Sequence, residues 1–152
     1  ARNKFSFKEK IKKTRHHNKP LTMTCGELKV FIVCAKDLPN KDERGDPYVN
    51  VYLDKKYIQK TQTIVGNLNP VWNEEFTFQV EDGVKTLHLD VFDSDEPSKK
   101  DDPLGTAKID LTDVFTKGEV EKTEQLVSSS ILGLALAKQG SITFRLTFTK
   151  KP

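Results

Sequence analysis

Cysteine is scarce in this sequence. Only two of the 152 residues are cysteine, Cys25 and Cys34, and both fall at one expected strand. An extended chain rises about 3.3 Å per residue, so the two side chains would lie on the order of 30 Å apart, beyond the reach of a disulfide. We therefore expect two free thiols in a reducing compartment. Two cysteines with no histidine near them also give no structural zinc site.

Long apolar segments are missing too. The longest apolar stretch, residues 131–137, is interrupted by Gly133, whereas a membrane-spanning helix needs about 20 apolar residues. The chain starts without methionine and without a signal-like apolar segment, so we expect an excised piece of a larger soluble protein. Its expected location is the cytoplasm. With 36% apolar and 31% charged residues, the composition predicts one globular domain rather than a disordered or fibrous chain.

Positive charge is concentrated at the start of the chain. Residues 1–19 hold eight Lys or Arg and one Glu, a net +7, while the whole chain is +3, so the remainder carries −4. We take residues 1–24 as a basic N-terminal leader or linker and 25–150 as the domain. Phe7 and Ile11 stand four apart among lysines, which is compatible with a basic amphipathic helix on a membrane; the alternative is a solvated linker. The charge suggests an anionic partner.

After Pro20 the sequence alternates with period two. Leu28, Val30, Ile32 and Cys34 are expected on one face of a first strand. Further strands are predicted at about 47–54, 57–64, 75–80, 85–92, 104–110 and 142–149, with a short helix near 111–116 and a weak strand near 125–128. Eight short strands in one domain predict an all-β fold, an eight-stranded antiparallel β-sandwich.

Carboxylates gather in two of the loops between these strands. Asp42 and Asp46 follow the first strand, and Asp93, Asp95, Asp101 and Asp102 follow the fifth. Loops of a sandwich cluster at its two ends, so the two groups can meet. Such a cluster repels itself without a cation, and Ca²⁺ takes 6–8 oxygen ligands in irregular geometry. The alternative is a set of solvated turn residues.

Three motifs identify a family resemblance. They are the segments Asp46-Pro47-Tyr48-Val49, Leu68 to Phe78 (LNPVWNEEFTF), and Val91-Phe92-Asp93-Ser94-Asp95 with Asp101 six residues later. In this order they resemble a C2 domain from about residue 27 to 150. The placement of the Gly26 and Gly140 segments is similar to the second strand topology of that family.

The resemblance implies calcium-dependent docking on anionic phospholipid by a peripheral membrane module of a signalling or trafficking protein. The family's metal ligands correspond to Asp42, Asp46, Asp93, Asp95 and Asp101, with Ser98 as an extra ligand. Empty loops would repel an anionic membrane, and bound calcium would invert the sign of their charge.

Two features of this chain depart from the family. Three residues separate Asp42 from Asp46, fewer than in most members, and Arg44 among them can act as an internal counter-ion in place of calcium. Glu43 and Pro97 occupy loop tips where membrane-inserting members carry large apolar residues. Docking is therefore expected to be electrostatic and sensitive to salt.

Lysines suggest a second lipid surface. Lys55, Lys56 and Lys60, with Trp72, resemble the polybasic groove that binds phosphoinositides in related domains, and the alternative is a solvated strand with a core-capping tryptophan. Lys99 and Lys100 can meet lipid phosphates beside the metal, or keep the loop solvated. Phosphatidylserine and phosphoinositides are the expected lipids.

The sequence also offers features of other functions. The short first loop and Arg44 favour a calcium-independent C2 domain that binds proteins or phosphoinositides. An enzyme is not expected: Asp93-Ser94-Asp95 matches a glycosyltransferase metal motif, but such enzymes need an α/β scaffold. No nucleic-acid partner is expected, because the leader lacks a base-reading motif. The isolated domain is expected to be monomeric.

Overall fold

The computed structural model describes residues 24–39, 45–95, 97, 100–128 and 138–152. The first half of the domain comprises strands β1 (Gly26–Lys36), β2 (Pro47–Tyr52), β3 (Gln59–Lys60) and β4 (Val71–Val80). The second half comprises β5 (Thr86–Asp93), β6 (Asp102–Asp110), helix α2 (Thr112–Lys117), β7 (Glu119–Val127) and β8 (Lys138–Lys150). The described part of the chain is thus all-β with one short helix, too short to cross a membrane.

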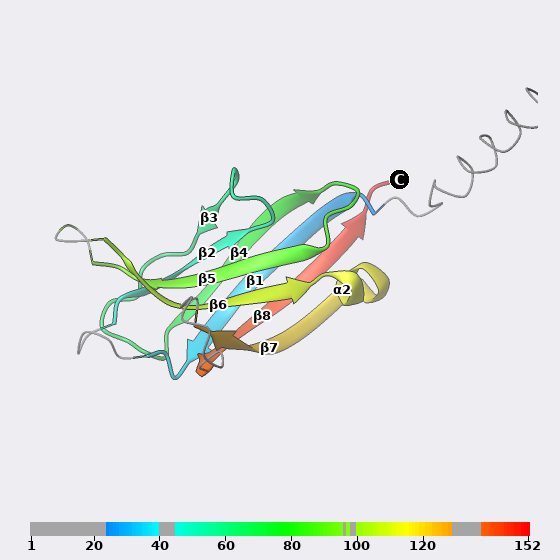
Figure 1. The fold of residues 1–152 in the computed structure, drawn as a ribbon. Coiled ribbons are helices and arrows are strands. Elements are labelled where there is room, and N and C mark those ends of the chain that lie inside the picture. The colour runs from blue at the N-terminus through cyan, green and yellow to red at the C-terminus, as the bar shows by residue number, and fades with distance from the viewer. Residues whose placement is uncertain (1–23, 40–44, 96, 98–99, 129–137) are drawn as a thin grey trace, which may run out of the picture.

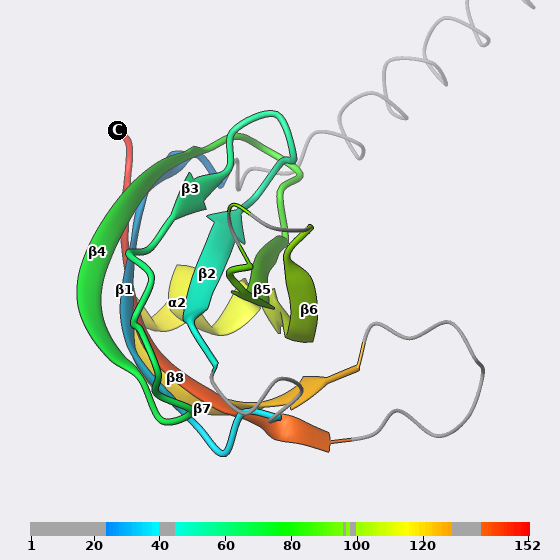
Figure 2. The same cartoon turned by 90° about the vertical axis from the view of Figure 1, so that its left-hand side faces the viewer.

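The strands form two antiparallel layers joined along one side. Their order is β3-β2-β5-β6-β7-β8-β1-β4, and Thr106↔Val127 is the one residue pair that links β6 to β7. Figure 2 shows β4, β1, β8 and β7 curving around β2, β5 and β6. This agrees with the expected sandwich and with the expected second strand topology. The strands β3 and β4 are left as the two free sheet edges.

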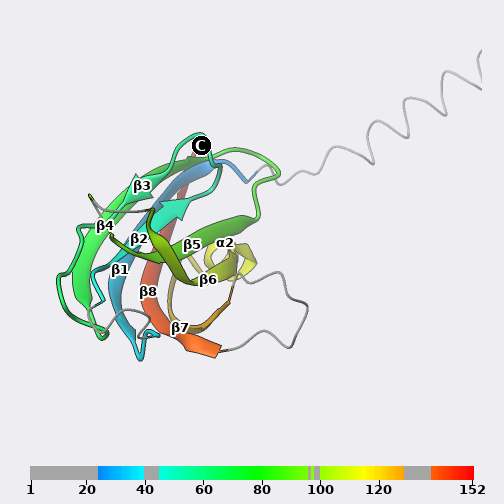
Figure 3. The same cartoon turned by 60° about the vertical axis from the view of Figure 1, so that its left-hand side comes forward.

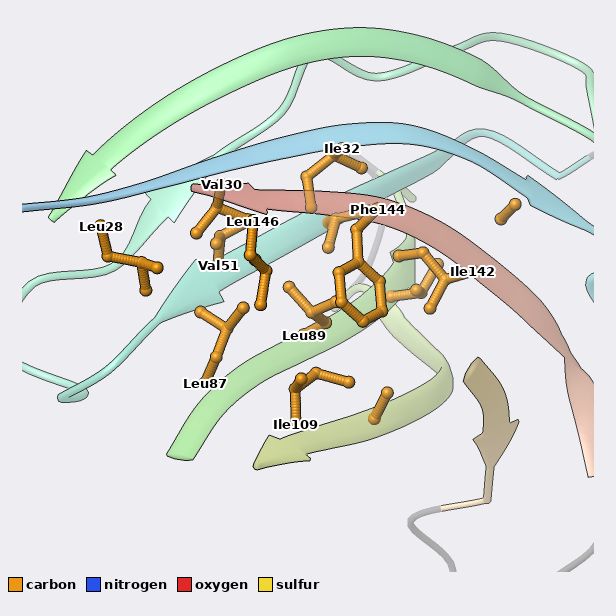
Figure 4. Packing of buried hydrophobic residues seen from close by; sticks show 14 of the residues in the cluster. Leu28, Val30, Ile32, Val51, Leu87, Leu89, Ile109, Ile142, Phe144 and Leu146 are labelled. Carbon is orange, nitrogen blue, oxygen red and sulfur yellow. The ribbon is translucent and has the colours of Figure 1, made fainter. Parts of the chain in front are cut away.

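The core fills the space between the layers. Alternate residues of β1 and β8 (Leu28, Val30, Ile32, Ile142, Phe144, Leu146) point toward Val51, Leu87, Leu89 and Ile109 of the other layer (Figure 4), and all are buried. The period-two pattern of the sequence therefore has its usual cause, because successive side chains of a strand face opposite sides.

A β-bulge corrects the predicted face of Cys34. The register of β1 shifts between Ile32 and Cys34 against both neighbouring strands. The extra residue moves Ala35 into the core, at 1% exposure, and leaves Cys34 half-buried. A bulge reverses the alternation beyond it, so the prediction that Cys34 shares the core face with Ile32 was wrong. Cys25 and Cys34 are both free thiols, as expected.

Several predicted boundaries also differ. The expected strand 57–64 shrinks to two residues, although Thr61 and Ile64 still donate backbone hydrogen bonds to Val49 and Pro47 of β2. β4 begins at Val71, four residues before the expected start, and the weak strand near 125–128 is the end of the longer β7. The short helix lies close to its predicted position.

The two ends of the sandwich are chemically different. The chain enters β1 and leaves β8 at one end, where the N–H of Lys151 donates to the carbonyl of Cys25 at 2.9 Å. Figure 1 shows the start of β2 and the end of β5 at the opposite end. The acidic loops and the point where the leader joins the domain are therefore separated by the length of β1, on the order of 35 Å for its eleven residues.

Candidate functional site

The structure brings the two acidic loops together through Asp46 and Asp93. Asp46 precedes β2 and Asp93 ends β5, and these strands pair in antiparallel fashion with Pro47 opposite Asp93. The backbone N–H of Asp46 donates to Oδ1 of Asp93 at 2.8 Å, and the N–H of Ser94 donates to the carbonyl of Asp46 at 3.0 Å. The meeting of these loops was predicted from the sandwich architecture and is confirmed.

Asp93 is a buried carboxylate held by a backbone N–H. It is 2% exposed, and no described lysine or arginine forms an ion pair with it. Asp46 is fixed in a similar way, since its Oδ1 accepts the N–H of Gly66 at 2.8 Å. Among the described residues, none donates a hydrogen bond to Oδ2 of either aspartate. A cation beside such a buried carboxylate would offset the cost of its desolvation.

Asp101 and Asp95 organise the loop that follows β5. Oδ1 of Asp101 accepts the N–H of Asp95 at 3.0 Å, and its Oδ2 accepts the hydroxyl of Tyr48 at 2.5 Å. The hydrogen bond from Tyr48, then that from Asp95, together with the charge of Lys60, hold the pKa of Asp101 below its usual range. Asp101 is therefore ionised at neutral pH. Oδ2 of Asp95 is buried in the same loop.

These four aspartates fit calcium in the chemistry of their donor atoms, which are all hard oxygens. In the described parts of the chain, however, no group of three or more His, Cys, Asp or Glu side chains is arranged to hold a metal. Two members of the predicted ligand set, Asp42 and Ser98, lie outside the described residues. The described portion of the site is thus the Asp46–Asp93 pair with Asp95 and Asp101 in the adjoining loop.

The predicted lysine cluster is divided by the fold. Lys60 stands opposite Asn50 of β2, and its Nζ lies 4.4 Å from the centre of the Tyr48 ring, on the side of the acidic loops. Lys55 and Lys56 lie in the turn beyond Tyr52, at the other end of β2. All three lysines are exposed. The strand geometry therefore does not favour a single headgroup site built from all three lysines.

Trp72 is a core residue in the structure. It is 7% exposed, and its indole N–H donates to the carbonyl of Gln62 at 3.0 Å. The prediction that Trp72 helps to hold a lipid headgroup is therefore corrected to the core-capping alternative. Of the two predicted lysines in the later loop, Lys100 is exposed and Lys99 lies outside the described residues.

An aromatic pair beside the acidic loops had no role in the sequence interpretation. Tyr48 and Phe92 face each other across β2 and β5, with ring centres 5.8 Å apart and planes inclined by 20°. Both belong to the quoted motifs, but only the strand register places them together. Tyr48 thus connects Lys60, which lies over its ring, to Asp101, which accepts its hydroxyl hydrogen bond.

A second polar network lies further along the same sheet face. Both carboxylate oxygens of Asp90 accept hydrogen bonds, one from the hydroxyl of Tyr52 at 2.8 Å and one from that of Thr106 at 2.5 Å. Burial, together with the hydrogen bond to Asp90 and its charge, raises the pKa of Tyr52 to about 12. Three neighbouring strands supply these residues, so sequence spacing gave no sign of the network.

His88 stacks on Tyr52, with ring centres 4.8 Å apart and planes inclined by 9°. Burial lowers the pKa of His88, and the charges of Lys108 and Lys55 lower it further, against the opposing effect of Asp90. The folded state therefore binds a proton at His88 less readily than the unfolded chain does. This contribution to stability is complete above the unfolded pKa of about 6.5 and is lost as the pH falls below it toward the lowered folded value.

We expect the free energy of unfolding to fall between about pH 7.5 and pH 5.5, above the range in which carboxylates titrate. His88→Phe keeps an aromatic ring against Tyr52 and should reduce this fall, as measured by urea unfolding at both pH values. The double variant His16→Gln with His17→Gln is the control and should retain the full dependence. An unchanged dependence in His88→Phe would contradict the assignment.

Comparison with known proteins now identifies the family. The profile of the C2 domain matches residues 26–126, which is most of the described domain. The chain belongs to the C2 domain family.

Individual relatives agree with this assignment. Synaptotagmin-1 of Aplysia californica is 40% identical over 130 residues, covering 81% of this chain and 30% of that protein. A calcium-dependent lipid-binding protein of Arabidopsis thaliana is 34% identical over 129 residues, covering 81% of this chain and 25% of that protein. A calcium-bound structure of two C2 domains of extended synaptotagmin-2 superposes with a TM-score of 0.70 at 27% identity, covering 84% of this chain and 46% of that structure. The chain thus spans less than a third of either full-length relative.

The fold also bears on the enzyme alternative. A glycosyltransferase needs helices between parallel strands to build its nucleotide site. The strand pairs of this domain are antiparallel, and the described residues contain only the six-residue helix α2. The Asp93-Ser94-Asp95 segment therefore runs from the end of β5 into the following loop of a β-sandwich, rather than lying in such a scaffold.

Proposed function

We propose that this domain binds anionic phospholipid membranes in response to calcium and thereby recruits a larger signalling or trafficking protein to the cytoplasmic face of a membrane. The observation that carries the proposal is the hydrogen bond from the backbone N–H of Asp46 to Oδ1 of Asp93. It joins the two acidic loops at a buried carboxylate. Asp95 and Asp101 extend the same acidic surface.

The residues of the site have separate tasks in this proposal. Asp46 and Asp93 would hold calcium with their Oδ2 atoms, because their Oδ1 atoms accept backbone hydrogen bonds that fix both side chains. Bound calcium supplies the positive charge that attracts lipid phosphate. Tyr48 keeps Asp101 ionised and oriented through its hydroxyl hydrogen bond. Without a cation, these carboxylates repel an anionic membrane.

Two basic side chains support lipid contact near the acidic loops. Lys60 lies over Tyr48 beside them, and Lys100 is exposed in the later loop. Pro97 is exposed in that loop and offers little apolar area for insertion. Docking that relies on charge weakens with salt, since the Debye length falls to about 8 Å at 0.15 M.

The relatives are consistent with this proposal. One is described as a calcium-dependent lipid-binding protein, and a structural neighbour was solved with calcium bound. In this proposal the domain prefers phosphatidylserine to phosphoinositides, because only Lys60 of the predicted basic cluster lies close to the acidic loops.

Vesicle co-sedimentation tests the proposal. We expect the protein to bind phosphatidylserine-containing vesicles at roughly 0.5 mM calcium and to remain in the supernatant with a chelator. Vesicles of neutral phosphatidylcholine are the lipid control and should not bind in either condition. Equal binding to the anionic vesicles with calcium and with chelator would contradict calcium dependence.

Calcium-independent binding of phosphoinositides or proteins is the second candidate. The observation that favours it is the position of Lys60. Its ammonium group lies over the Tyr48 ring and its charge lowers the pKa of Asp101, so the protein already places a positive charge of its own beside the acidic loop. Calorimetric titration with calcium separates the two functions. Stoichiometric heats support the first, and the absence of heat supports the second.

A further inference from the structure

A groove lies at the open side of the sandwich, away from the acidic loops. It occupies roughly 430 Å³ between the turn after β2 and the end of β4, which is within the size range of ligand-binding pockets. Figures 2 and 3 show β3 beside β4 here, and Nε2 of Gln59 donates to the carbonyl of Thr77 across the two edges at 2.8 Å. The apolar lining residues are Leu53, Tyr57, Phe78 and Val84.

The groove combines apolar surface with negative charge. Asp54 and Glu81 line it; among the described residues no lysine or arginine belongs to the lining, and the exposed Lys55, Lys56 and Lys85 are chain neighbours of lining residues. Asp82 adds a third exposed carboxylate directly after Glu81. Tyr57 is 73% exposed and the adjacent Ile58 is 46% exposed. Exposed apolar side chains beside exposed carboxylates are suited to a segment that carries both lysines and aromatic residues.

Such a segment joins the domain at this end. The N–H of Thr24 lies 3.4 Å from Oδ1 of Asp82, and Gly26 pairs with Val80 of β4. The chain preceding Thr24 therefore starts next to the wall of the groove. Residues 1–19 carry a net charge of +7 and include Phe5, Phe7 and Ile11.

We propose that the basic leader, residues 1–19, docks in the groove of its own domain formed by Leu53, Asp54, Tyr57, Phe78, Glu81 and Val84. Its lysines pair with Asp54, Glu81 and Asp82, and Phe5 or Phe7 covers the apolar lining. The domain itself is thus the anionic partner that the charge of the leader calls for. This inference does not depend on calcium or lipid.

The covalent connection favours this contact over one with the acidic loops. From Phe7 to Thr24 the chain can extend about 55 Å, ample to reach a groove that starts beside Thr24. A short tether gives an effective concentration in the millimolar range, so even a weak contact is populated. The acidic loops lie at the far end of β1 and so experience a lower effective concentration of the leader.

Paramagnetic relaxation in the full chain tests the proposal. Cys25 and Cys34 are replaced by serine, a nitroxide is attached at Ser6→Cys, and amide signals are compared with those of the reduced label. With a millimolar effective concentration, we expect the amide intensities of Gln59, Thr77 and Gln79 to fall by about half or more. Signals of Thr123 and Thr143, which stand opposite each other in β7 and β8, should change little.

A charge-reversed pair provides the decisive variant. Asp54→Lys with Glu81→Lys should restore the signals of the groove, whereas Glu119→Lys with Glu121→Lys, the same charge change at exposed positions of β7, should leave the intensity loss in place. Raising the salt concentration from about 0.05 M to about 0.5 M should also restore the groove signals of the unchanged domain, because salt screens the ion pairs. The dispersed amide spectrum of each variant verifies that it is folded.

Two results would overturn the proposal. One is the same intensity loss in both charge-reversed variants, which would show that the groove is not the site. The other concerns a mixture of two kinds of chain, one with the nitroxide but no ¹⁵N and one with ¹⁵N but no nitroxide. If the groove amides lose intensity in this mixture, the leader docks on a second copy.

Discussion

Replacing both Asp93 and Asp95 by asparagine is expected to weaken calcium-stimulated binding to phosphatidylserine vesicles by at least about 10-fold, since calcium affinity follows the number of charged ligands. Asparagine has nearly the shape of aspartate and retains an oxygen acceptor for the N–H of Asp46. The junction of the two loops should therefore persist while two negative charges are lost. Co-sedimentation over a range of calcium concentrations measures the effect.

The matched control for this variant lies at the other end of the sandwich. Asp110→Asn removes a carboxylate that ends β6 and accepts the N–H of Thr112 at 2.8 Å. It changes the net charge without touching the acidic loops, so calcium-stimulated binding should be close to that of the unchanged protein. If the Asp93 and Asp95 variant binds vesicles as well as this control does, the acidic loops are not the calcium site.

Replacing Phe144 by alanine is expected to lower the free energy of unfolding by about 3–5 kcal/mol, the usual cost of removing a buried aromatic ring. Phe144 is fully buried in the middle of β8 and points into the space between the layers (Figure 4). Its neighbour across the sheet, Ile32 of β1, is also fully buried. The cavity left by the ring cannot close without moving both layers, and urea unfolding measures the loss.

Val65→Ala is the comparison for the core variant. Val65 is 66% exposed in the turn that follows β3, and surface substitutions of this kind usually change stability by less than about 0.5 kcal/mol. A similar small effect of Phe144→Ala would indicate that the two layers do not close on one core.

Local alternation allowed most of the strands to be predicted. In β5, Leu87, Leu89 and Val91 are fully buried while the residues between them are half-buried. The alternation of apolar and polar residues in the sequence therefore predicts which side chains of this strand face the core. The first part of β7 lacked this signal, since only Val120 is apolar among its first six residues. Lys122 lies on the same strand and instead pairs with Asp113 of α2 at 2.8 Å, a contact that sequence spacing does not indicate.

The candidate site divides in the same way. The aspartates could be found in the sequence because they belong to short motifs, and the meeting of Asp46 with Asp93 follows from where loops lie in a sandwich. Their hydrogen-bond partners could not be found. Tyr48 reaches Asp101 from a strand 53 positions earlier, and Gly66 reaches Asp46 from a separate turn.

The sequence by itself determined the all-β class, the C2 family and the carboxylates of the acidic loops, because period-two alternation and short motifs are local properties of the chain. Only the tertiary structure decided that Trp72 is in the core, that Cys34 faces away from it, and that Lys60 is separated from Lys55 and Lys56. Those outcomes depend on a bulge and on which strands pair, and strand pairing is set by the burial of side chains distant in the sequence.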